Sequence, residues 1–267
     1  MKMTAQEIYK SIESIRSQAP VVHNITNYVV MNNTANALLA IGASPVMAHA
    51  KEEVEEMVNI SSALVINIGT LSEHWIYSMF KAVNQARKKG IPVILDPVGA
   101  GATAYRTKTA RELIGDEPPT IIRGNASEIA ALYDDKSRTR GVDSASSSEA
   151  AIEIARRLSE MHKCVVCVSG ATDYVVSKER IMKVRNGHSL MTKVTGLGCT
   201  ASALCGAFAA VEKNSFAATV KAMAVMGIAG EMATAAVTGP GSLQLHFLDC
   251  LYRISQDDIA KRLKVEN

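Results

Sequence analysis

Aromatic residues are scarce in this chain, making up 4% of its 267 residues with a single Trp. Proteins that hold single-stranded nucleic acid stack its bases on exposed aromatic rings, so this scarcity argues against such a surface. The formal net charge is only +3, and the basic residues are dispersed along the chain. Both features lead us to expect no nucleic-acid partner.

The sequence also lacks the usual marks of secretion and membrane insertion. Its five cysteines are an odd number without the spacing of a disulfide framework, which predicts a reducing compartment and a cytoplasmic protein. Residues 1–19 are charged and amphipathic, unlike a signal peptide. The most apolar late segment, 216–237, contains Lys221 and Glu231, so we expect a buried helix there and no membrane partner.

Short apolar runs alternate with amphipathic segments along the chain. The runs predict strands at 21–22, 44–47, 63–68, 91–95, 120–122, 164–168, 174–176 and 181–184. This alternation predicts an α/β fold in one domain over 1–267, with a mostly parallel central sheet covered by helices on both faces. The polar segment 134–148 predicts an exposed loop rather than a domain boundary.

The stretch 193–204 is the most distinctive in the chain. Its spacing predicts a strand, a turn at Gly196 and Gly198, and then a buried helix whose first turn holds Cys199. The free N–H groups and the dipole at a helix start favour an anion, and they lower the pKa of a thiol placed there. Three interpretations compete: a loop before a core helix, a dinucleotide fingerprint, and an anion hole for phosphoryl transfer. The fingerprint lacks its usual context, because no strand ending in an acidic residue follows about 20 positions later.

Polar residues gather just after the predicted strands. In a parallel sheet these positions share one edge, where ligands bind, so together they favour a ligand crevice over ordinary loop polarity. The clusters are Asn24 with Asn27, Asp96, Arg123 with Asn125, 169–173, and 196–199.

Several of these residues have two interpretations. Asp96 and Glu128 follow neighbouring predicted strands and suit Mg²⁺, which takes one or two carboxylates plus water and phosphate oxygens; alternatively, they cap a turn and a helix. The guanidinium of Arg123 fits a phosphate or a surface ion pair. Cys199 is either a general base or a small buried hydrophobe.

Other polar and sulfur-bearing residues carry weaker signals. His23 and His49 either line the crevice or cap turns. Cys164 and Cys167 lie three positions apart in an apolar strand and therefore face opposite sides, which predicts core packing rather than a metal site. The chain has no P-loop motif, so a nucleotide must be held in another way.

The chain resembles the hydroxyethylthiazole kinase family, a thiamine-salvage branch of the ribokinase-like superfamily, from about residue 21 to about residue 251. The resemblance lies in Ile25-Thr26-Asn27, Gly42-Ala43-Ser44-Pro45-Val46-Met47, Asn67-Ile68-Gly69-Thr70-Leu71, Asp96-Pro97-Val98-Gly99-Ala100-Gly101-Ala102, Arg123-Gly124-Asn125-Ala126-Ser127-Glu128, Ser169-Gly170 with Asp173, and Val194-Thr195-Gly196-Leu197-Gly198-Cys199.

The resemblance implies a ribokinase-like fold and a kinase that phosphorylates the hydroxyl of 4-methyl-5-(2-hydroxyethyl)thiazole with ATP and Mg²⁺. It also implies a homotrimer with substrate pockets at the subunit interfaces. The implied roles are thiazole contact for Asn27, Met47 and Gly196, ATP binding for Arg123 and Ser169, Mg²⁺ binding through water for Asp96 and Glu128, an anion hole for Gly196, Leu197, Gly198 and Cys199, and catalysis for Cys199.

Two positions depart from the family pattern, and two other functions stay open. Leu197 is often smaller in relatives, so we expect only its backbone N–H to matter, and Ser169 stands where Thr is common. One alternative is a kinase for another vitamin-precursor alcohol of the pyrimidine or pyridoxal type. The other is a catalytically silent nucleotide-binding protein, in which Cys199 is an inert substitute for the Asp of most ribokinase-like enzymes.

Overall fold

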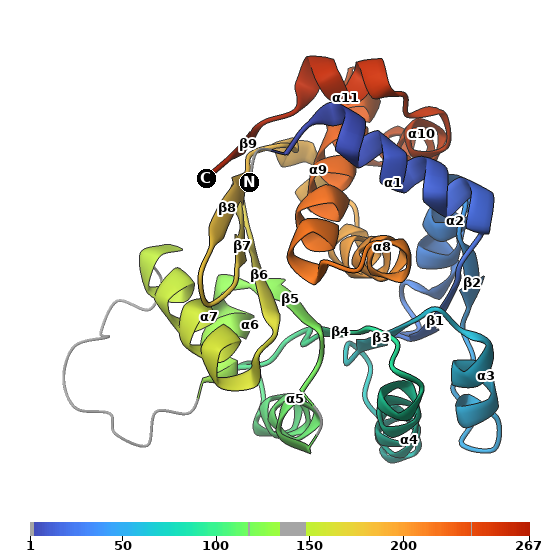
Figure 1. Cartoon of the computed structure of the whole chain (residues 1–267), viewed down its shortest axis with the longest axis vertical. Coiled ribbons are helices and arrows are strands. Elements are labelled where there is room, and N and C mark those ends of the chain that lie inside the picture. The colour runs from blue at the N-terminus through green and yellow to red at the C-terminus, as the bar shows by residue number, and fades with distance from the viewer. Residues whose placement is uncertain (1–2, 117, 134–147, 236) are drawn as a thin grey trace.

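A nine-stranded sheet runs through the computed structural model, which describes residues 3–116, 118–133, 148–235 and 237–267 (Figure 1). The strand order is β2-β1-β3-β4-β5-β6-β7-β8-β9. The strands are β1 (Val21–Ile25), β2 (Ser44–Val46), β3 (Ala63–Asn67), β4 (Val93–Asp96), β5 (Ile121–Asn125), β6 (Val165–Ser169), β7 (Asp173–Val176), β8 (Ile181–Val184) and β9 (Val265–Glu266).

Strands β1 to β6 pair in parallel, and β7, β8 and β9 add an antiparallel ribbon at one edge. The prediction of a mostly parallel sheet is therefore confirmed. Strand β9 was not predicted; it is two residues long and pairs Glu266 with Lys183. So short a strand leaves no hydrophobic period in the sequence.

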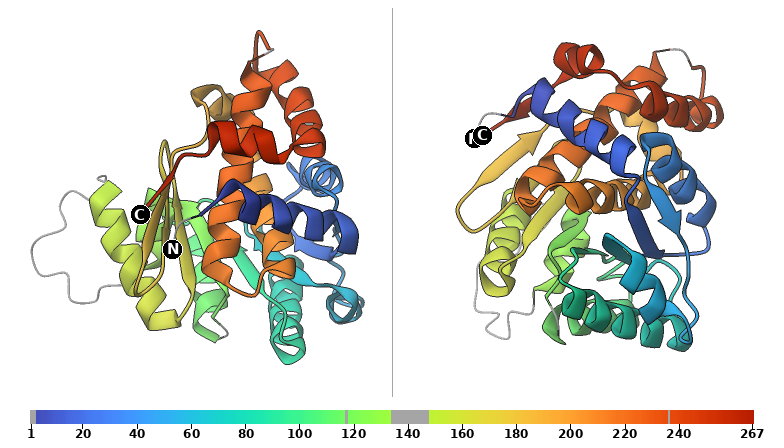
Figure 2. Two further views of the ribbon diagram at one scale, coloured as in Figure 1. Left: turned by 45° about the horizontal axis from the view of Figure 1, so that its top comes forward. Right: turned by 45° about the vertical axis from the view of Figure 1, so that its right-hand side comes forward.

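Helices cover both faces of this sheet, as predicted (Figures 1 and 2). One face carries α1 (Ala5–Gln18), α2 (Met31–Ile41), α8 (Leu197–Val211), α9 (Ser215–Thr234), α10 (Pro240–Arg253) and α11 (Gln256–Arg262). The other carries α3 (Val54–Ile60), α4 (Glu73–Lys89), α5 (Ala104–Asp116), α6 (Ala126–Leu132) and α7 (Ser148–His162).

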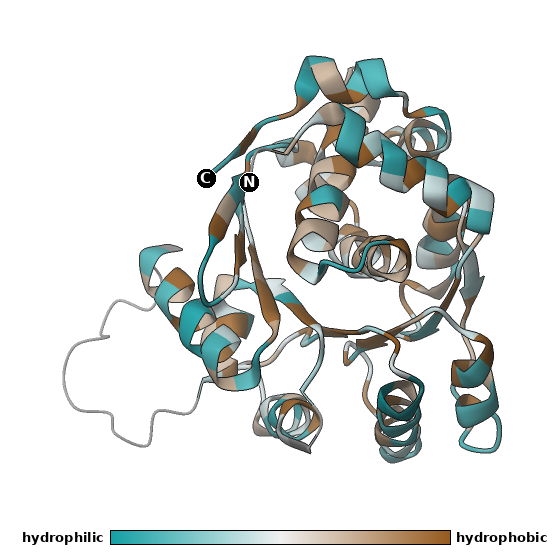
Figure 3. Cartoon of the chain, in the orientation of Figure 1, coloured by the Kyte–Doolittle hydropathy of each residue, from teal (hydrophilic) through white to brown (hydrophobic). Residues whose placement is uncertain are grey.

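Each face of the sheet has its own hydrophobic core, because side chains alternate along a strand. In β6, Cys167 packs into the core under α8 and α9, whereas Val166 and Val168 pack into the core on the other face. Cys164 joins this second core, so the prediction that Cys164 and Cys167 face opposite sides is confirmed. The sheet and the inner helix faces are apolar, and the outer helix faces are polar (Figure 3).

Local signals fix the helix ends. Thr4 and Glu7 form a capping box at α1, and Gly42 ends α2 in the left-handed conformation. Helix α6 begins at Ala126, because the Asn125 side chain caps it and forms a capping box with Glu128. The predicted loop 134–148 lies outside the described residues, apart from Ser148 at the start of α7.

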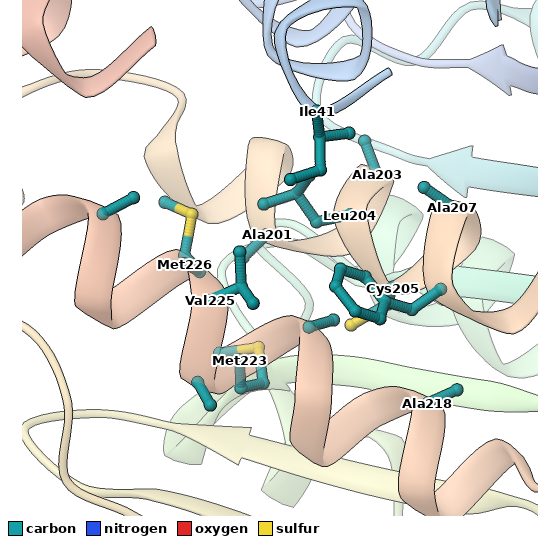
Figure 4. Packing of buried hydrophobic residues seen from close by; sticks show 14 of the residues in the cluster. Ile41, Ala201, Ala203, Leu204, Cys205, Ala207, Ala218, Met223, Val225 and Met226 are labelled. Carbon is teal, nitrogen blue, oxygen red and sulfur yellow. The ribbon is translucent and has the colours of Figure 1, made fainter. Parts of the chain in front are cut away.

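Helices α8 and α9 are buried along nearly their whole length and pack on each other through small residues (Figure 4). Among the described residues, α9 is the one helix long and apolar enough to cross a membrane, and 94% of its apolar window is buried inside the protein. Its buried Lys221 amine is paired, donating to Glu212 Oε2 (2.7 Å) and Ser11 Oγ (3.0 Å). The predicted core helix is therefore confirmed.

The predicted strand at 193–195 is wrong. A 3₁₀ helix, η1 (Ser189–Lys193), ends where this strand was expected to begin, and Val194 and Thr195 form a bend and a turn. The His188 side chain caps η1 by accepting the Leu190 N–H (3.1 Å). This local hydrogen bond offers the backbone an alternative to a strand. The glycine turn and the buried helix are confirmed, with Gly196 at φ 84° as the N-cap of α8.

Candidate active site

A crevice of about 420 Å³ opens at the carboxyl edge of the parallel strands. Its lining residues are Asn27, Val29, Val30, Gly69, Asp96, Val98, Arg123, Asn125, Glu128, Ser169, Thr195, Gly196, Gly198 and Cys199. A second hollow, of about 510 Å³, lies at the start of α5 and gathers no strand-end polar groups. The chemistry therefore concentrates in the first crevice.

Most of the predicted site residues meet in this crevice, but Met47 and Leu197 do not line it. Met47 follows β2, the edge strand. The Leu197 side chain packs into the core on the α8 face, so its bulk does not narrow the crevice. The N–H of Leu197 still lies at the start of α8, ahead of the first helical hydrogen bond from Thr200 N–H to Gly196 O (2.9 Å).

Asp96 ends β4 and is only 1% exposed. Its Oδ2 accepts hydrogen bonds from Asn67 Nδ2 (2.9 Å) and Ser202 Oγ (2.7 Å), whereas its Oδ1 is buried without a hydrogen-bond partner among the described residues. Burial raises the pKa of Asp96 to about 6, although the guanidinium of Arg123 acts in the opposite direction. The Asp96 carboxylate is thus held in place by the hydrogen bonds to Oδ2, and its Oδ1 is left to bind a ligand.

Asn27 links this carboxylate to the glycine turn. Its Nδ2 donates to Asn67 Oδ1 (2.8 Å) and to Cys199 Sγ (3.5 Å), and its Oδ1 accepts the Val29 N–H (3.1 Å). Asn27, Asn67, Asp96 and Ser202 therefore form one hydrogen-bonded chain along the crevice floor. Such a chain holds each member in a single orientation.

Sequence reasoning assigned no role to Asn67 and did not single out Ser202. Asn67 ends a buried strand at the same edge as Asp96, so the rule that selected Asp96 applied to it as well. Ser202 lies three residues after Cys199 on α8, on the helix face of the site.

Glu128 both caps α6 and lines the crevice. Its Oε2 accepts the Asn125 N–H (2.8 Å) and its Oε1 accepts the Gly99 N–H (2.9 Å). The helix-capping interpretation is confirmed, and it is compatible with a second role because each carboxylate oxygen has two lone pairs.

The site fits a hydrated divalent cation. No group of three or more His, Cys, Asp or Glu that could hold a metal occurs in the part of the chain that the structure describes. Mg²⁺ needs no such cluster, since one or two carboxylates suffice when water and phosphate complete its octahedron. The unpartnered Oδ1 of Asp96 and the carboxylate of Glu128 offer that donor set.

The prediction of a lowered thiol pKa at Cys199 is wrong. Burial and, to a smaller extent, the Asp96 carboxylate raise the pKa of Cys199 to about 11, against the opposing hydrogen bonds from Asn67 and Asn27. Loss of hydration is the largest of these effects. The thiol is protonated at neutral pH.

Arg123 lies against the start of α8. A Cβ at Gly198 would come 3.1 Å from Arg123 Nη1, so the glycine lets the guanidinium approach the helix closely. Its electrostatic partners include the buried carboxylates Asp96 and Asp173, so the surface ion-pair interpretation is wrong. Ser169, at the end of β6, donates from Oγ to Gly124 O (3.2 Å).

The two histidines fasten the loop after β2. His23 Nε2 donates to the Ala48 carbonyl (2.7 Å), and His49 Nδ1 lies 3.3 Å from the Met47 carbonyl oxygen. Neither lines the crevice, so the interpretation of His23 and His49 as crevice residues is wrong.

The fold is that of the ribokinase-like class. A ribokinase-like superfamily protein from Enterococcus faecalis V583 has the same fold, with a TM-score of 0.64 at 12% identity over 90% of this chain and 89% of that one. The model of the hydroxyethylthiazole kinase family matches residues 12–257.

Two full-length relatives agree. A hydroxyethylthiazole kinase from Syntrophus aciditrophicus is 60% identical over 99% of this chain and 98% of its own length. The structure of a hydroxyethylthiazole kinase protein from Pyrococcus horikoshii OT3 superposes with a TM-score of 0.90 at 44% identity, covering 98% of both chains. The chain belongs to the hydroxyethylthiazole kinase family and is an enzyme, an ATP-dependent kinase.

A pH dependence of stability follows from buried Asp173, whose Oδ1 accepts the Gly170 N–H (3.0 Å). Burial raises its pKa from 3.8 to about 6, so the folded state holds the proton more tightly than the unfolded state does. This group therefore stabilises the fold fully below about pH 4, and that contribution is lost as the pH rises to about 6. Asp173→Asn keeps the acceptor but does not titrate.

Relative to the parent, Asp173→Asn is expected to gain up to about 3 kcal/mol of unfolding free energy between about pH 4 and pH 7, at 1.36 kcal/mol per pKa unit. Urea unfolding of both proteins across this range measures the difference. A difference that stays constant with pH contradicts the raised pKa.

Proposed function

We propose that this chain transfers the γ-phosphoryl group of ATP to the hydroxyl of 4-methyl-5-(2-hydroxyethyl)thiazole in the crevice. The observation that carries the proposal is the convergence of three features. They are the carboxylate of Asp96, of which only one oxygen is hydrogen-bonded among the described residues, the guanidinium of Arg123, and the N–H groups at the start of α8. Phosphoryl transfer needs positioning and charge neutralisation above all, and these groups supply both.

The nucleotide side is formed by Arg123 and Ser169. Arg123 is a permanent cation whose planar fork matches phosphate oxygens, and its Nε is buried with no hydrogen-bond partner in the part of the chain that the structure describes. An anion hole stabilises negative charge on the phosphoryl group during its transfer. It consists of the N–H groups of Gly196, Leu197, Gly198 and Cys199.

Asp96 and Glu128 would hold Mg²⁺ through water. The ion supplies neutralisation of the phosphate charge when it is bound. Asp96 is suited to this task because Asn67 and Ser202 satisfy Oδ2 and leave Oδ1 for a metal-bound water.

The alcohol side is formed by Asn27 and Gly196, both at the crevice, and by Met47, which lies outside the crevice formed by one chain. We propose that a homotrimer completes the pocket at its subunit interfaces. Tyr28 (66% exposed) and Val29 (61% exposed) are adjacent, and Val29 lines the crevice, so a subunit seated against them would bury apolar surface directly beside the site, which supports this. We place the enzyme in the cytoplasm, as one domain over 1–267.

Cys199 is proposed as the general base, which takes the hydroxyl proton as the alcohol attacks. With a thiol pKa of about 11, the thiolate is a minor species at neutral pH, so the reaction is slow and accelerates in alkali.

The assignment is tested by a coupled assay of ADP release with the thiazole alcohol, ATP and varied Mg²⁺, beside a panel of pyrimidine and pyridoxal-type alcohols. Asp96→Asn and Glu128→Gln should each lower turnover by roughly 10²-fold, since each weakens the binding of the Mg²⁺ that neutralises the phosphate charge, while calorimetric thiazole affinity stays within about threefold. Asp249→Asn, an exposed carboxylate on α10, is the control. Absent turnover, or a better substrate in the panel, would falsify the thiazole assignment.

The role of Cys199 is tested by the pH dependence of turnover. The parent rate should rise about tenfold per pH unit between about pH 7 and pH 9, because the thiolate fraction rises in that way below the thiol pKa. Cys199→Ala should lose roughly 10²- to 10⁴-fold of the rate, and Cys199→Asp should keep activity without the alkaline rise, since its carboxylate is already ionised. If Cys199→Ala turns over like the parent, the thiol is not the base.

The trimer is tested by light scattering at micromolar concentration, which should return about three times 28.5 kDa. Tyr28→Asp should shift this mass toward the monomer, because a charge at a closed apolar interface is costly. Tyr252→Asp, on α10 and similarly exposed, is the control. A parent that scatters as a monomer refutes the trimer.

A further inference from the structure

Arg106, on α5, makes a set of contacts that neither the sequence motifs nor the family match brings out. Its Nη1 donates to Ile68 O (2.9 Å) and Val98 O (2.7 Å), and its Nη2 donates to Gly69 O (2.7 Å). The first and third carbonyls belong to the loop after β3, and the second belongs to the loop after β4. One guanidinium therefore joins two neighbouring loops.

Both loops form walls of the crevice and carry its polar groups. Gly69 and Val98 line the crevice. The Gly69 N–H donates to Asn67 Oδ1 (3.0 Å), and the same oxygen accepts from Asn27 Nδ2. On the other loop, the Gly99 N–H donates to Glu128 Oε1 (2.9 Å).

The Arg106 side chain fits closely against the second loop. Gly99 has φ 75°, and a Cβ there would come 3.1 Å from Arg106 Cδ. The loop therefore adopts a left-handed turn that packs directly on the arginine stem.

We propose that Arg106 is a positioning residue that sets the spacing between two walls of the crevice. One wall is the loop after β3, on the alcohol-binding side, and the other is the loop after β4, on the metal-binding side. It does not line the crevice and acts through Gly69 and Asn67 on one side and through Val98, Gly99 and Glu128 on the other. The inference rests on the proposed function, because it concerns the alignment of the two substrates.

The planar fork of arginine explains why this position needs a guanidinium. Two nitrogens held in one plane donate to three carbonyls of two loops at once, whereas a Lys ammonium is a single point donor on a flexible stem. When the hydrogen bonds to one of the two loops are lost, the two walls can move relative to each other. A misplacement of about 1 Å between reacting groups costs up to about 10²-fold in rate.

The test is Arg106→Lys, with Arg111→Lys as the matched control. Arg111 lies on the same helix and also donates to backbone carbonyls, those of Ala131 (2.8 Å and 3.1 Å) and Tyr133 (3.4 Å) at the end of α6, which do not line the crevice. Arg106→Lys should lower kcat by roughly 10- to 100-fold with the ATP KM within about threefold, whereas Arg111→Lys should keep kcat within about twofold at a similar loss of melting temperature.

Chemical rescue gives a second readout. Guanidinium chloride at about 20 mM should restore at least part of the kcat of Arg106→Ala, relative to KCl at the same concentration, because the free ion can reoccupy the space between the loops. It should not improve Arg111→Ala. If Arg106→Ala does not fold, Arg106→Lys and the measurement below decide.

Hydrogen exchange separates this inference from the proposed function. In Arg106→Lys, peptides covering 67–71 and 97–101 should both exchange faster, while Arg111→Lys should leave both unchanged. Equal kcat losses in the two Lys variants, or faster exchange in neither or only one of the two loops, overturn the positioning role. A parent without thiazole turnover overturns the proposed function, and the exchange measurement still decides whether Arg106 couples the loops.

Discussion

The site depends on a buried carboxylate that is satisfied on one oxygen only. Taking Asp96 out of water is costly, and the two hydrogen bonds to its Oδ2 offset part of that cost. They also fix the orientation of the carboxylate, so the lone pairs of Oδ1 point in one defined direction. Because Asn67 supplies one of these bonds and also holds Asn27, the two sides of the crevice share one set of hydrogen bonds.

Helix α8 serves the core and the site through small residues at a spacing of four. Gly198 makes room for Arg123, Ser202 reaches Asp96, and Gly206 lies against Val65, where a Cβ would come 2.8 Å from Cγ2. Residues four apart lie on one face of a helix, so these three form a single stripe. The stripe lets α8 lie close enough to the sheet for its start to reach the strand ends.

The sheet, its two covering layers and the edge that carries the site were predictable from the spacing of hydrophobic residues and the alternation of strands and helices along the chain. Parallel register places Asn67 beside Asp96 as direct partners, which is why strand-end polar residues converge. The family resemblance, rather than physical reasoning, assigned individual roles.

Three features were beyond the sequence pattern. The pKa of Cys199 depends on burial by residues distant in sequence. The 3₁₀ helix before the glycine turn depends on the His188 cap, which leaves no hydrophobic period. Arg106 acts on carbonyls of a loop 37 and 38 residues away, and backbone carbonyls carry no sequence signal.

The burial of α9 bears on how the chain is made. Chains leave the ribosome N-terminus first, so β1 to β8, which end at Val184, emerge before Ser215 begins α9. The helix that is apolar enough to enter a bilayer therefore appears when most of the surface that covers it already exists. Among its neighbouring helices, α10 and α11 follow it in the chain, so the interval in which α9 is open to insertion or aggregation lasts until these two helices have been made.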